Sequence, residues 1–306
     1  MKLYFAPLEG ITTYTYRNAH SEMFGECDKY FSPFITPTAN EKISLKSLRD
    51  ILPEKNKTNL VVQALCNDTE AFWGFSEKVK DLGYNEINLN FGCPSGTVVK
   101  KMRGAGALRD IDSLDRFLDG IFLKTDMTIS VKTRTGFYSH DEFDEILSIY
   151  NKYPISELIV HPRTREEYYN NLPNEESFGK AYSGAKTKLS FNGNVYSAKD
   201  YERIIQKYDR LDSVMIGRGA IKNPAIFREI RGGKPLATKE LVDFSNLLEE
   251  RYLKVLGSEI YTLHKLKEIW MYMVQNFPEE KKILKAVKKA NRLCDLNSAI
   301  GCLSEL

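Results

Sequence analysis

The chain has 306 residues, of which 42% are hydrophobic and 28% are charged, with a formal net charge of +3 and an isoelectric point near 8.4. This composition is typical of an ordinary soluble globular chain. No apolar run approaches the ~18 residues that a membrane helix needs, and the N-terminus lacks the apolar core of a secretory signal, so we expect a cytoplasmic protein without membrane contact.

Eight short strand-like runs follow one another along the first three quarters of the chain. They cover residues 3–6, 29–31, 60–64, 86–90, 128–133, 157–161, 188–192 and 213–216. Amphipathic segments between them, such as 69–82 and 141–150, have the spacing of helices. Strands that alternate with helices indicate a parallel sheet.

Eight such units in about 230 residues predict an α/β fold of the (β/α)₈ TIM barrel type, which typically takes ~250 residues. An open doubly wound sheet is the alternative. The barrel is favoured because nearly every strand ends in polar or small residues, and the catalytic groups of this fold gather at the carboxyl ends of the strands.

The pattern changes after Gly232, Gly233 and Pro235, which mark a break in the chain. Strand patterns stop there, and long amphipathic segments cover 241–255, 261–277 and 279–293. The sequence therefore predicts a barrel domain over 1–233 and a small helical domain over 234–306.

Polar side chains end five of the predicted strands: Gln63, Asn90, Lys132, His161 and Asn192. Together they offer hydrogen-bond donors, acceptors and one cation around a common centre, which suits a planar polar ring with an anionic reduced state. A lysine there can stabilise negative charge that develops on a bound group. A structural ion pair at the barrel rim is the alternative for Lys132.

Two glycine-containing turns follow the seventh and eighth strands, in SFNGN (190–194) and MIGRGA (215–220). Glycine lets backbone N–H groups approach an anion, and Arg218 adds a forked donor. TIM barrels often bind phosphate at these two loops, so we expect a phosphate site rather than two ordinary turns.

The five cysteines are scattered, and their spacing indicates neither a metal site nor a disulfide framework. We expect Cys27, Cys66, Cys294 and Cys302 to be small packing residues. Cys93 differs because it stands just past a strand, in NLNFGCPSG. Its thiol could donate a proton or act as a nucleophile, and the lack of a His partner favours the proton donor.

Arg134 and Arg163 each lie two residues beyond a strand-end side chain, on the same side of an extended chain, so each is expected to line the same cleft. Such arginines suit a base edge or a phosphate, and a structural ion pair at the rim is the alternative. His20, His140 and His264 have no partner pattern and are interpreted as surface or packing residues.

The chain resembles the tRNA-dihydrouridine synthases along its whole length, and the APLEG opening is closest to bacterial members. The motifs are APLEGIT (6–12), VQAL around Gln63, NLNFGCPSGTVVKKMRGAGAL (88–108), VKTRTGF (131–137), VHPRT (160–164), NGN (192–194) and GRGAIKNPAIF (217–227). The sequence departs from the family pattern at Leu8, Thr13 and Pro162, where methionine, aspartate and glycine are frequent.

This resemblance implies an oxidoreductase that reduces uridine in tRNA to dihydrouridine, with FMN over the barrel mouth and NADPH as a transient reductant. The implied flavin contacts are Ala6, Pro7, Leu8, Gln63, Lys132, His161, Asn192, Gly193 and Asn194, with the phosphate at Gly217 and Arg218. Flavin N5 would pass hydride to uracil C6 while Cys93 protonates C5, and Lys132 would stabilise the reduced flavin. Asn90, Arg134 and Arg163 would hold the uridine.

The helical domain fits an RNA partner, because the segment 265–292 carries many more lysines and arginines than acids, with Trp270, Tyr272 and Phe277 nearby. A solvated face with aromatics in the core is the alternative. We expect a monomer that binds tRNA and holds no metal.

Two other functions remain open. One is an FMN barrel that acts on a free pyrimidine, like a dihydroorotate dehydrogenase. The other is a non-catalytic RNA-binding barrel. The VHPRT arginine, the setting of Cys93 and the basic helical domain argue against the first, and the presence of Cys93, Lys132 and His161 argues against the second.

Overall fold

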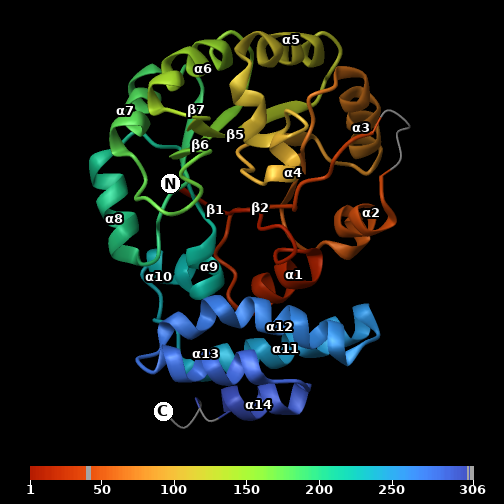
Figure 1. Ribbon diagram of the computed structural model, residues 1–306, viewed down its shortest axis with the longest axis vertical. Coiled ribbons are helices and arrows are strands. Elements are labelled where there is room, and N and C mark those ends of the chain that lie inside the picture. Colours follow the sequence, from red (N-terminus) through yellow and green to blue (C-terminus); the bar gives the residue numbers. More distant parts are fainter. Residues whose placement is uncertain (39–42, 302, 304–306) are drawn as a thin grey trace.

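The computed structural model describes residues 1–38, 43–301 and 303. Within these ranges, eight parallel strands close into a barrel in chain order (Figure 1). The strands are β1 (Lys2–Phe5), β2 (Lys29–Phe31), β3 (Leu60–Ala64), β4 (Glu86–Phe91), β5 (Thr128–Gly136), β6 (Glu157–Thr164), β7 (Lys188–Phe191) and β8 (Ser213–Ile216). Because β1 pairs with both β2 and β8, the predicted TIM barrel is confirmed and the open sheet is excluded.

Helices follow the strands and form the outer layer of the barrel. They are α1 (Tyr14–Met23), α2 (Leu45–Ile51), α3 (Thr69–Asp81), α4 (Gly96–Val99), α5 (Ile111–Phe122), α6 (Phe143–Tyr150), α7 (Glu175–Gly184), α8 (Ala198–Lys207), α9 (Arg218–Lys222) and α10 (Ile226–Ile230). The 3-10 turns are η1 (Pro53–Lys55), η2 (Gly104–Arg109) and η3 (His140–Glu142).

Side-chain caps set where several of these helices begin. Asp68, Asp110, Asn174 and Ser197 each accept the backbone N–H of the third residue into the helix. Such a cap satisfies an N–H group that has no partner within the helix. The caps therefore also fix the lengths of the loops that leave the strands at the barrel mouth.

The interior of the barrel is packed. Tyr4, Phe31, Val61, Ile159 and Met215 form an apolar cluster in which each side chain is at most 3% exposed. The main core lies between the strands and the surrounding helices. A filled interior leaves the carboxyl ends of the strands as the place for a site, as in other TIM barrels.

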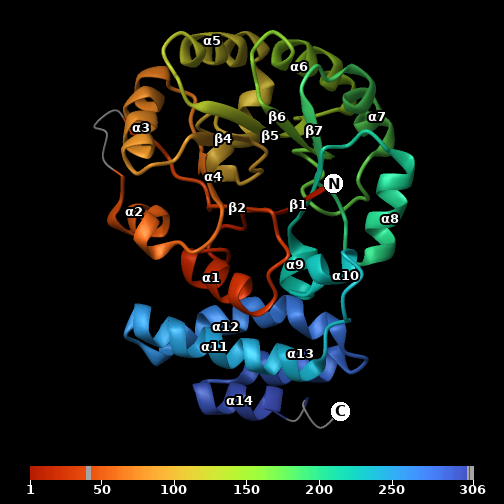
Figure 2. The ribbon, with the colours of Figure 1, turned by 180° about the vertical axis from the view of Figure 1, so that it is seen from behind.

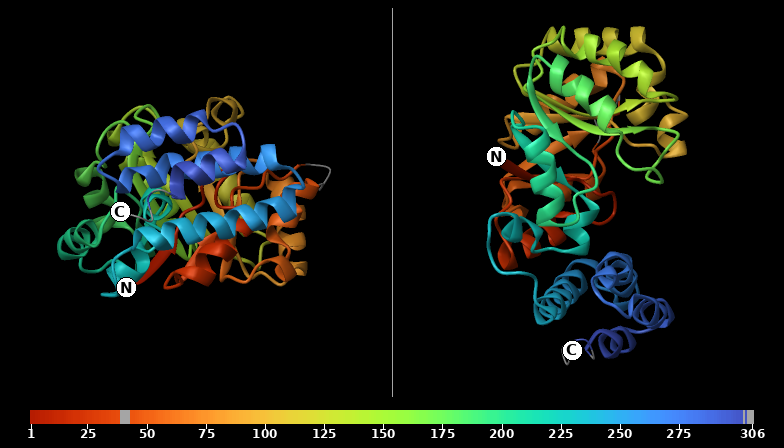
Figure 3. Two further views of the ribbon diagram at one scale, coloured as in Figure 1. Left: turned by 90° about the horizontal axis from the view of Figure 1, so that it is seen from below. Right: turned by 90° about the vertical axis from the view of Figure 1, so that its left-hand side faces the viewer.

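Four helices follow the barrel and pack in a layer against the side that carries α1 and α9 (Figures 1 and 2). They are α11 (Thr238–Leu256), α12 (Glu259–Met273), α13 (Glu280–Lys289) and α14 (Leu293–Gly301), with η4 (Val274–Asn276) after α12. Figure 3 shows the same layer from below and from the side.

The contact between the helical layer and the barrel is aromatic. The ring of Phe244 on α11 meets Tyr16 and Phe24 of the α1 region edge-on, with centroids 5.5 and 5.2 Å apart. Trp270 is fully buried and its Nε1 donates to the Ser245 hydroxyl at 2.9 Å, so it belongs to the core rather than to an exposed surface. Within the described chain, no helix combines the length and apolarity needed to cross a membrane.

The segment 279–293 forms two helices rather than one. A single helix over 279–293 is wrong, because the chain turns after Lys289. The Asp295 carboxylate accepts the N–H groups of Asn291 and Arg292 at 3.2 and 3.0 Å, which starts a separate helix there. Lys267 donates to the carbonyls at the end of α13 at 2.8 Å, which caps the preceding helix.

The cysteine expectations hold only in part. Cys66 is buried and Cys27 half-buried, as packing residues would be, whereas Cys294 is exposed on α14 and the packing expectation for it is wrong. Cys302 lies outside the described residues. Of the histidines, His20 is fully buried and hydrogen-bonded to Tyr30 at 2.8 Å.

Candidate active site

The carboxyl ends of the strands open into a cavity of about 500 Å³, which we call the mouth cavity. Most of the expected site residues line it: Ala6, Pro7, Leu8, Gln63, Asn90, Cys93, Lys132, Arg134, His161, Asn192, Gly193, Gly217 and Arg218. Two others lie behind this wall. Arg163 is hydrogen-bonded to His161, which lines the cavity, and Asn194 is hydrogen-bonded to Arg218, which also lines it.

Asn90 holds the turn that carries Cys93. Its Oδ1 accepts the backbone N–H groups of Gly92 and Cys93 at 3.0 and 2.9 Å. Its Nδ2 donates to Gln63 Oε1 at 2.8 Å, and Gln63 in turn donates to Asn88 at 2.8 Å. Asparagine often fixes a turn by accepting backbone N–H groups just ahead of it. The asparagines at the end of β4 therefore position the thiol.

The η2 segment fixes the same turn from the other side. Ala105 donates its backbone N–H to the carbonyl of Cys93 at 3.0 Å. Gly104 has φ of +55°, and a Cβ there would lie only 2.8 Å from that carbonyl oxygen, so the contact requires glycine.

The environment of Cys93 favours the protonated thiol. Burial raises its pKa above the ordinary value, and the backbone of Ser95 and the charge of Arg134 only partly oppose this shift. The group is therefore a thiol rather than a thiolate at neutral pH, and it lines the cavity where a proton could be delivered.

Lys132 lies beside Asn90 in the register of β4 and β5 and is half-buried in the cavity wall. In the described structure its ammonium group makes no hydrogen bond or ion pair with the protein. Burial, and next the charge of Arg134, lower its pKa from 10.5 to about 7. An anion in the mouth cavity would favour its charged form.

His161 is held as a neutral ring of known tautomer. Its Nδ1 lies 2.6 Å from the carbonyl of Asn192, which can only accept, so Nδ1 carries the proton. Nε2 accepts from Arg163 at 3.2 Å, because a guanidinium can only donate. Burial lowers its pKa well below 6.5. His161 is therefore a fixed polar wall rather than a proton carrier.

Arg134 and Arg163 are buried and donate chiefly to backbone carbonyls, several of which lie at the end of β6 and in the loop that follows it. Arg134 Nη1 donates to Thr164 and Tyr168 at 2.7 and 2.9 Å. Arg163 Nε donates to Asn171 at 2.7 Å. These bonds hold the loop in place at the edge of the mouth cavity.

Arg218 completes a cluster of four cations with Lys132, Arg134 and Arg163. Its Nη2 and that of Arg163 both donate to Asn194 Oδ1 at 3.1 Å. Among residues 1–38, 43–301 and 303, none of the four forms an ion pair. Burial lowers the pKa of Arg163, and the charge of Arg218 lowers it further. Buried charges in proteins are usually paired, so the cluster is suited to bind an anion.

The residues present fit a flavin mononucleotide. Its phosphate would complete the charge of the cation cluster beside Gly193, Gly217 and Arg218, where backbone and guanidinium donors meet. The unpaired Lys132 is placed at the strand ends, where the ring would lie. The donor set therefore matches an anionic, planar cofactor.

The other residues that line the cavity include four polar ones to which the sequence assigned no role at the mouth. Glu9 lies in the β1–α1 loop, and Glu268 and Tyr272 come from α12. Tyr169 lies near two guanidinium groups, with the Arg218 carbon 4.6 Å from its ring centre. Glu9 lies within the APLEGIT motif, whereas Glu268 and Tyr272 reach the mouth only because α12 packs beside it.

Comparison with known proteins gives a family match for nearly the whole chain. The family model described as Dihydrouridine synthase (Dus) matches residues 4–301. A probable tRNA-dihydrouridine synthase of Staphylococcus aureus strain N315 is 28% identical over 284 residues, covering 88% of this chain and 83% of that protein. The tRNA-dihydrouridine(16) synthase of Neisseria meningitidis serogroup B is 26% identical over 288 residues, covering 90% and 86%.

Solved structures share the fold at low sequence identity. Morphinone reductase superposes with a TM-score of 0.55 at 10% identity, over 78% of this chain and 87% of that chain. Histamine dehydrogenase from Rhizobium gives a TM-score of 0.53 at 10% identity, over 80% of this chain and 49% of that chain.

Proposed function

The chain belongs to the dihydrouridine synthase (Dus) family, and on that premise we propose that it reduces uridine in tRNA to 5,6-dihydrouridine with FMN and NADPH. The tRNA substrate is proposed from the names of the similar bacterial proteins. The observation that carries the mechanism is the mouth cavity, in which a protonated thiol and a cation cluster face one space.

The strand-end residues are proposed to hold the cofactor. Arg218, Gly217, Gly193 and Asn194 form the phosphate side, and Ala6, Pro7, Leu8, Gln63, Lys132, His161 and Asn192 surround the ring. FMN, when bound, supplies the electron pair and the hydrogen that arrive at C6 of uracil. Lys132 is only partly charged at neutral pH, and an anion beside it would favour its full charging, which adds electrostatic stabilisation when negative charge develops there.

Cys93 is proposed as the general acid. Reduction of the C5–C6 bond needs one proton at C5, and a buried thiol with a raised pKa keeps its proton at neutral pH until the reaction draws it away. The hydrogen bonds of the Cys93 backbone to Asn90 and Ala105 hold the residue that carries the sulfur at the cavity wall. Arg134 makes the environment more positive, which stabilises the thiolate that remains.

Asn90, Arg134 and Arg163 are the proposed uridine-binding residues, and their contacts suggest different contributions. Asn90 and Arg134 line the cavity directly. Arg163 lies behind His161 and donates to it, so its proposed contribution is to hold that ring and the loop after β6 in the binding geometry.

The helical domain is proposed to bind the tRNA backbone through α13. Lys281, Lys282, Lys285, Lys288 and Lys289 are exposed on this helix, while Ile283 and Val287 face the core. A row of exposed lysines attracts phosphates without reading sequence. Lys267 is different, because it is engaged with the end of α13.

The proposal is tested with purified protein and tRNA that lacks dihydrouridine. We expect flavin released on denaturation to be FMN, and we expect NADPH and tRNA together to yield dihydrouridine, detected by mass spectrometry of digested tRNA. Tests with free uracil, uridine and orotate address the small-molecule alternative. Reduction of a free pyrimidine with no action on tRNA would reject the tRNA substrate, and a protein that neither contains nor binds FMN would reject the cofactor.

A further inference from the structure

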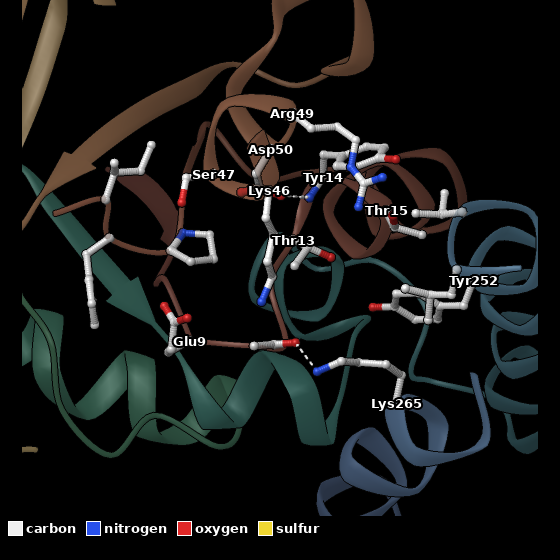
Figure 4. Close-up of a pocket in the computed structure, with 16 residues that line it drawn as sticks. Glu9, Thr13, Tyr14, Thr15, Lys46, Ser47, Arg49, Asp50, Tyr252 and Lys265 are labelled. Carbon is white, nitrogen blue, oxygen red and sulfur yellow. Dashed lines mark hydrogen bonds between the residues drawn. The ribbon is translucent and has the colours of Figure 1, made fainter. Parts of the chain in front are cut away.

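A second cavity, which we call the side pocket, lies where the barrel meets the helical layer (Figure 4). Its volume is about 140 Å³. The β1–α1 loop, α2 and the end of α11 form its walls, and Lys265 of α12 adds one side. Glu9, Pro33 and Phe34 line both this pocket and the mouth cavity, so the two spaces are neighbours.

A buried hydroxyl makes the side pocket a polar site. Tyr252 is 3% exposed, and its hydroxyl makes no well-formed hydrogen bond within the described ranges, although the Thr13 side chain is a nearby polar neighbour. Figure 4 shows this hydroxyl directed into the pocket, with Thr13 close by. Buried hydroxyl groups are nearly always hydrogen-bonded, because an unbonded one loses its contact with water without compensation. A polar group from outside the chain would supply a well-formed hydrogen bond.

The charge of the pocket wall favours an anion. Lys46 and Arg49 contribute two cations, and Figure 4 shows the Lys46 amine directed into the pocket, whereas the Lys265 ammonium is already bonded to Glu268 and to the Gly10 carbonyl. No described residue forms an ion pair with Lys46 or Arg49. Of the two carboxylates in the wall, Asp50 is already paired with a buried arginine at 3.1 Å, and Glu9 lies at the boundary with the mouth cavity.

We propose that the side pocket binds a nucleotide of the substrate RNA adjacent to the uridine being reduced, an inference that rests on the proposed function. A uridine in the mouth cavity must leave its stack, and its neighbour then needs a place of its own. The neighbouring base lies against Val255 and Leu256 and bonds to the Tyr252 hydroxyl, while its phosphate faces Lys46. Apolar walls with cations beside them are typical of sites for single-stranded nucleic acid.

The test compares two buried tyrosines, Tyr16 and Tyr252, of which only Tyr252 lines the side pocket. Tyr252→Phe should lower kcat/KM for tRNA about three- to tenfold, as the loss of one hydrogen bond does. Tyr16→Phe should leave it unchanged. Both variants should keep the wild-type FMN content, melting temperature and rate of flavin reduction by NADPH.

A second variant and a modified substrate locate the contact. Val255→Trp adds bulk at the half-buried pocket wall and should also lower kcat/KM for tRNA, in protein that keeps its flavin. For wild-type enzyme, kcat/KM should fall by the same factor when the RNA carries an abasic residue on one side of the target uridine. In Tyr252→Phe, the abasic residue should cause no further fall in kcat/KM, because two changes that remove the same contact are not additive.

Three results would overturn the assignment. Wild-type kcat/KM for tRNA in both Tyr252→Phe and flavin-loaded Val255→Trp would mean that the pocket takes no part in RNA binding. A raised KM for NADPH with unchanged tRNA kinetics would assign the pocket to the dinucleotide. Equal losses in Tyr16→Phe and Tyr252→Phe would indicate a packing effect. Failure of the proposed function is distinct, since wild-type enzyme would then leave tRNA unreduced.

Discussion

Two groups of positive charges in the described part of the protein differ in their surroundings. In the wall of the mouth cavity and just behind it, Arg134 and Arg163 are at most 1% exposed, and their guanidinium groups are held by backbone carbonyls. On α13, the lysines are exposed and point away from the core residues Ile283 and Val287. The first group is shielded from solvent and held by hydrogen bonds, whereas the second is open to solvent.

This difference assigns the two groups different tasks. A cation that is buried and fixed has a lowered pKa and gains most from an anion of matching shape in one place. An exposed lysine is screened by salt and interacts with any nearby phosphate. The mouth cavity is therefore suited to cofactor binding and chemistry, whereas α13 adds affinity for a polyanion. Substitutions should separate these two effects.

The largest effect is expected at the mouth from Cys93→Ala. Dihydrouridine formation should fall roughly 10²–10⁴-fold, as is typical when a general acid is lost. FMN content and tRNA affinity should stay at the wild-type values, because the thiol contributes to neither. The measurement is single-turnover oxidation of prereduced enzyme by tRNA, with dihydrouridine counted by mass spectrometry.

Two further variants complete this test. Cys93→Ser supplies a weaker acid and should restore little activity. Cys294→Ala removes an exposed thiol and should behave like wild type. Wild-type turnover in Cys93→Ala would show that another group delivers the proton. A parallel loss of tRNA affinity would show that the mouth cavity also contributes to tRNA binding, contrary to the separation from α13.

Arg218→Ala should weaken the binding of FMN, since it removes a charge-assisted donor from the cation cluster. The expected loss is about 1.5–3 kcal/mol, which corresponds to roughly a 10- to 150-fold higher Kd. Titration of flavin-free protein with FMN measures it. Arg210→Ala is the matched control, because that arginine is exposed and lies against Tyr182 away from the mouth. Unchanged FMN affinity would place the phosphate elsewhere.

The ends of the strands were the most predictable part of the site. Parallel strands of a barrel bring their carboxyl ends together, so Gln63, Asn90, Lys132 and His161 could be assigned to one cavity from alternation alone. The structure confirms that they share the mouth cavity. Their chemical roles remain predictions.

The remainder depends on tertiary contacts that no local pattern encodes. Glu268 and Tyr272 reach the mouth only because α12 packs beside it. Arg163 was expected to line the cleft with Arg134, but its guanidinium contacts the carbonyl of Asn171 in a loop eight residues further on. The break after α13 likewise depends on the cap from Asp295, which an amphipathic pattern across 279–293 does not reveal.

Neutralising the exposed lysines should weaken tRNA binding and leave the chemistry intact. When Lys281, Lys282, Lys288 and Lys289 are changed to Gln, we expect roughly tenfold weaker tRNA binding near physiological salt. The slope of the logarithm of the binding constant against the logarithm of salt concentration should become shallower by about one for each phosphate that the variant no longer neutralises. Filter binding across a salt series measures both. The rate of flavin reduction by NADPH should not change.

The control for this variant carries the same change in net charge. Lys2, Lys124, Lys186 and Lys188 are exposed near the amino-terminal ends of the strands, on the opposite side of the barrel from the mouth. Their replacement by Gln should leave the salt dependence as it is. Equal losses in the two variants would mean that total charge, rather than the position of α13, governs tRNA binding.

The smallest effect concerns pH and Lys132, whose pKa is lowered to about 7 by burial and by Arg134. Above pH 7 the flavin-free protein has lost this proton, and an anion that binds beside the amine must bring the proton back. The Kd for FMN should therefore rise about fivefold between pH 7 and pH 8, and Lys132→Met should remove this dependence.

For folding stability, the effect of pH has the opposite sign. The unfolded chain keeps the Lys132 proton up to its ordinary pKa of 10.5, so the free energy of unfolding of flavin-free protein should increase as pH rises above 7. Titrations with FMN and denaturant at each pH measure both slopes, and a flat FMN profile in wild type would show that the amine of Lys132 is not beside the bound anion.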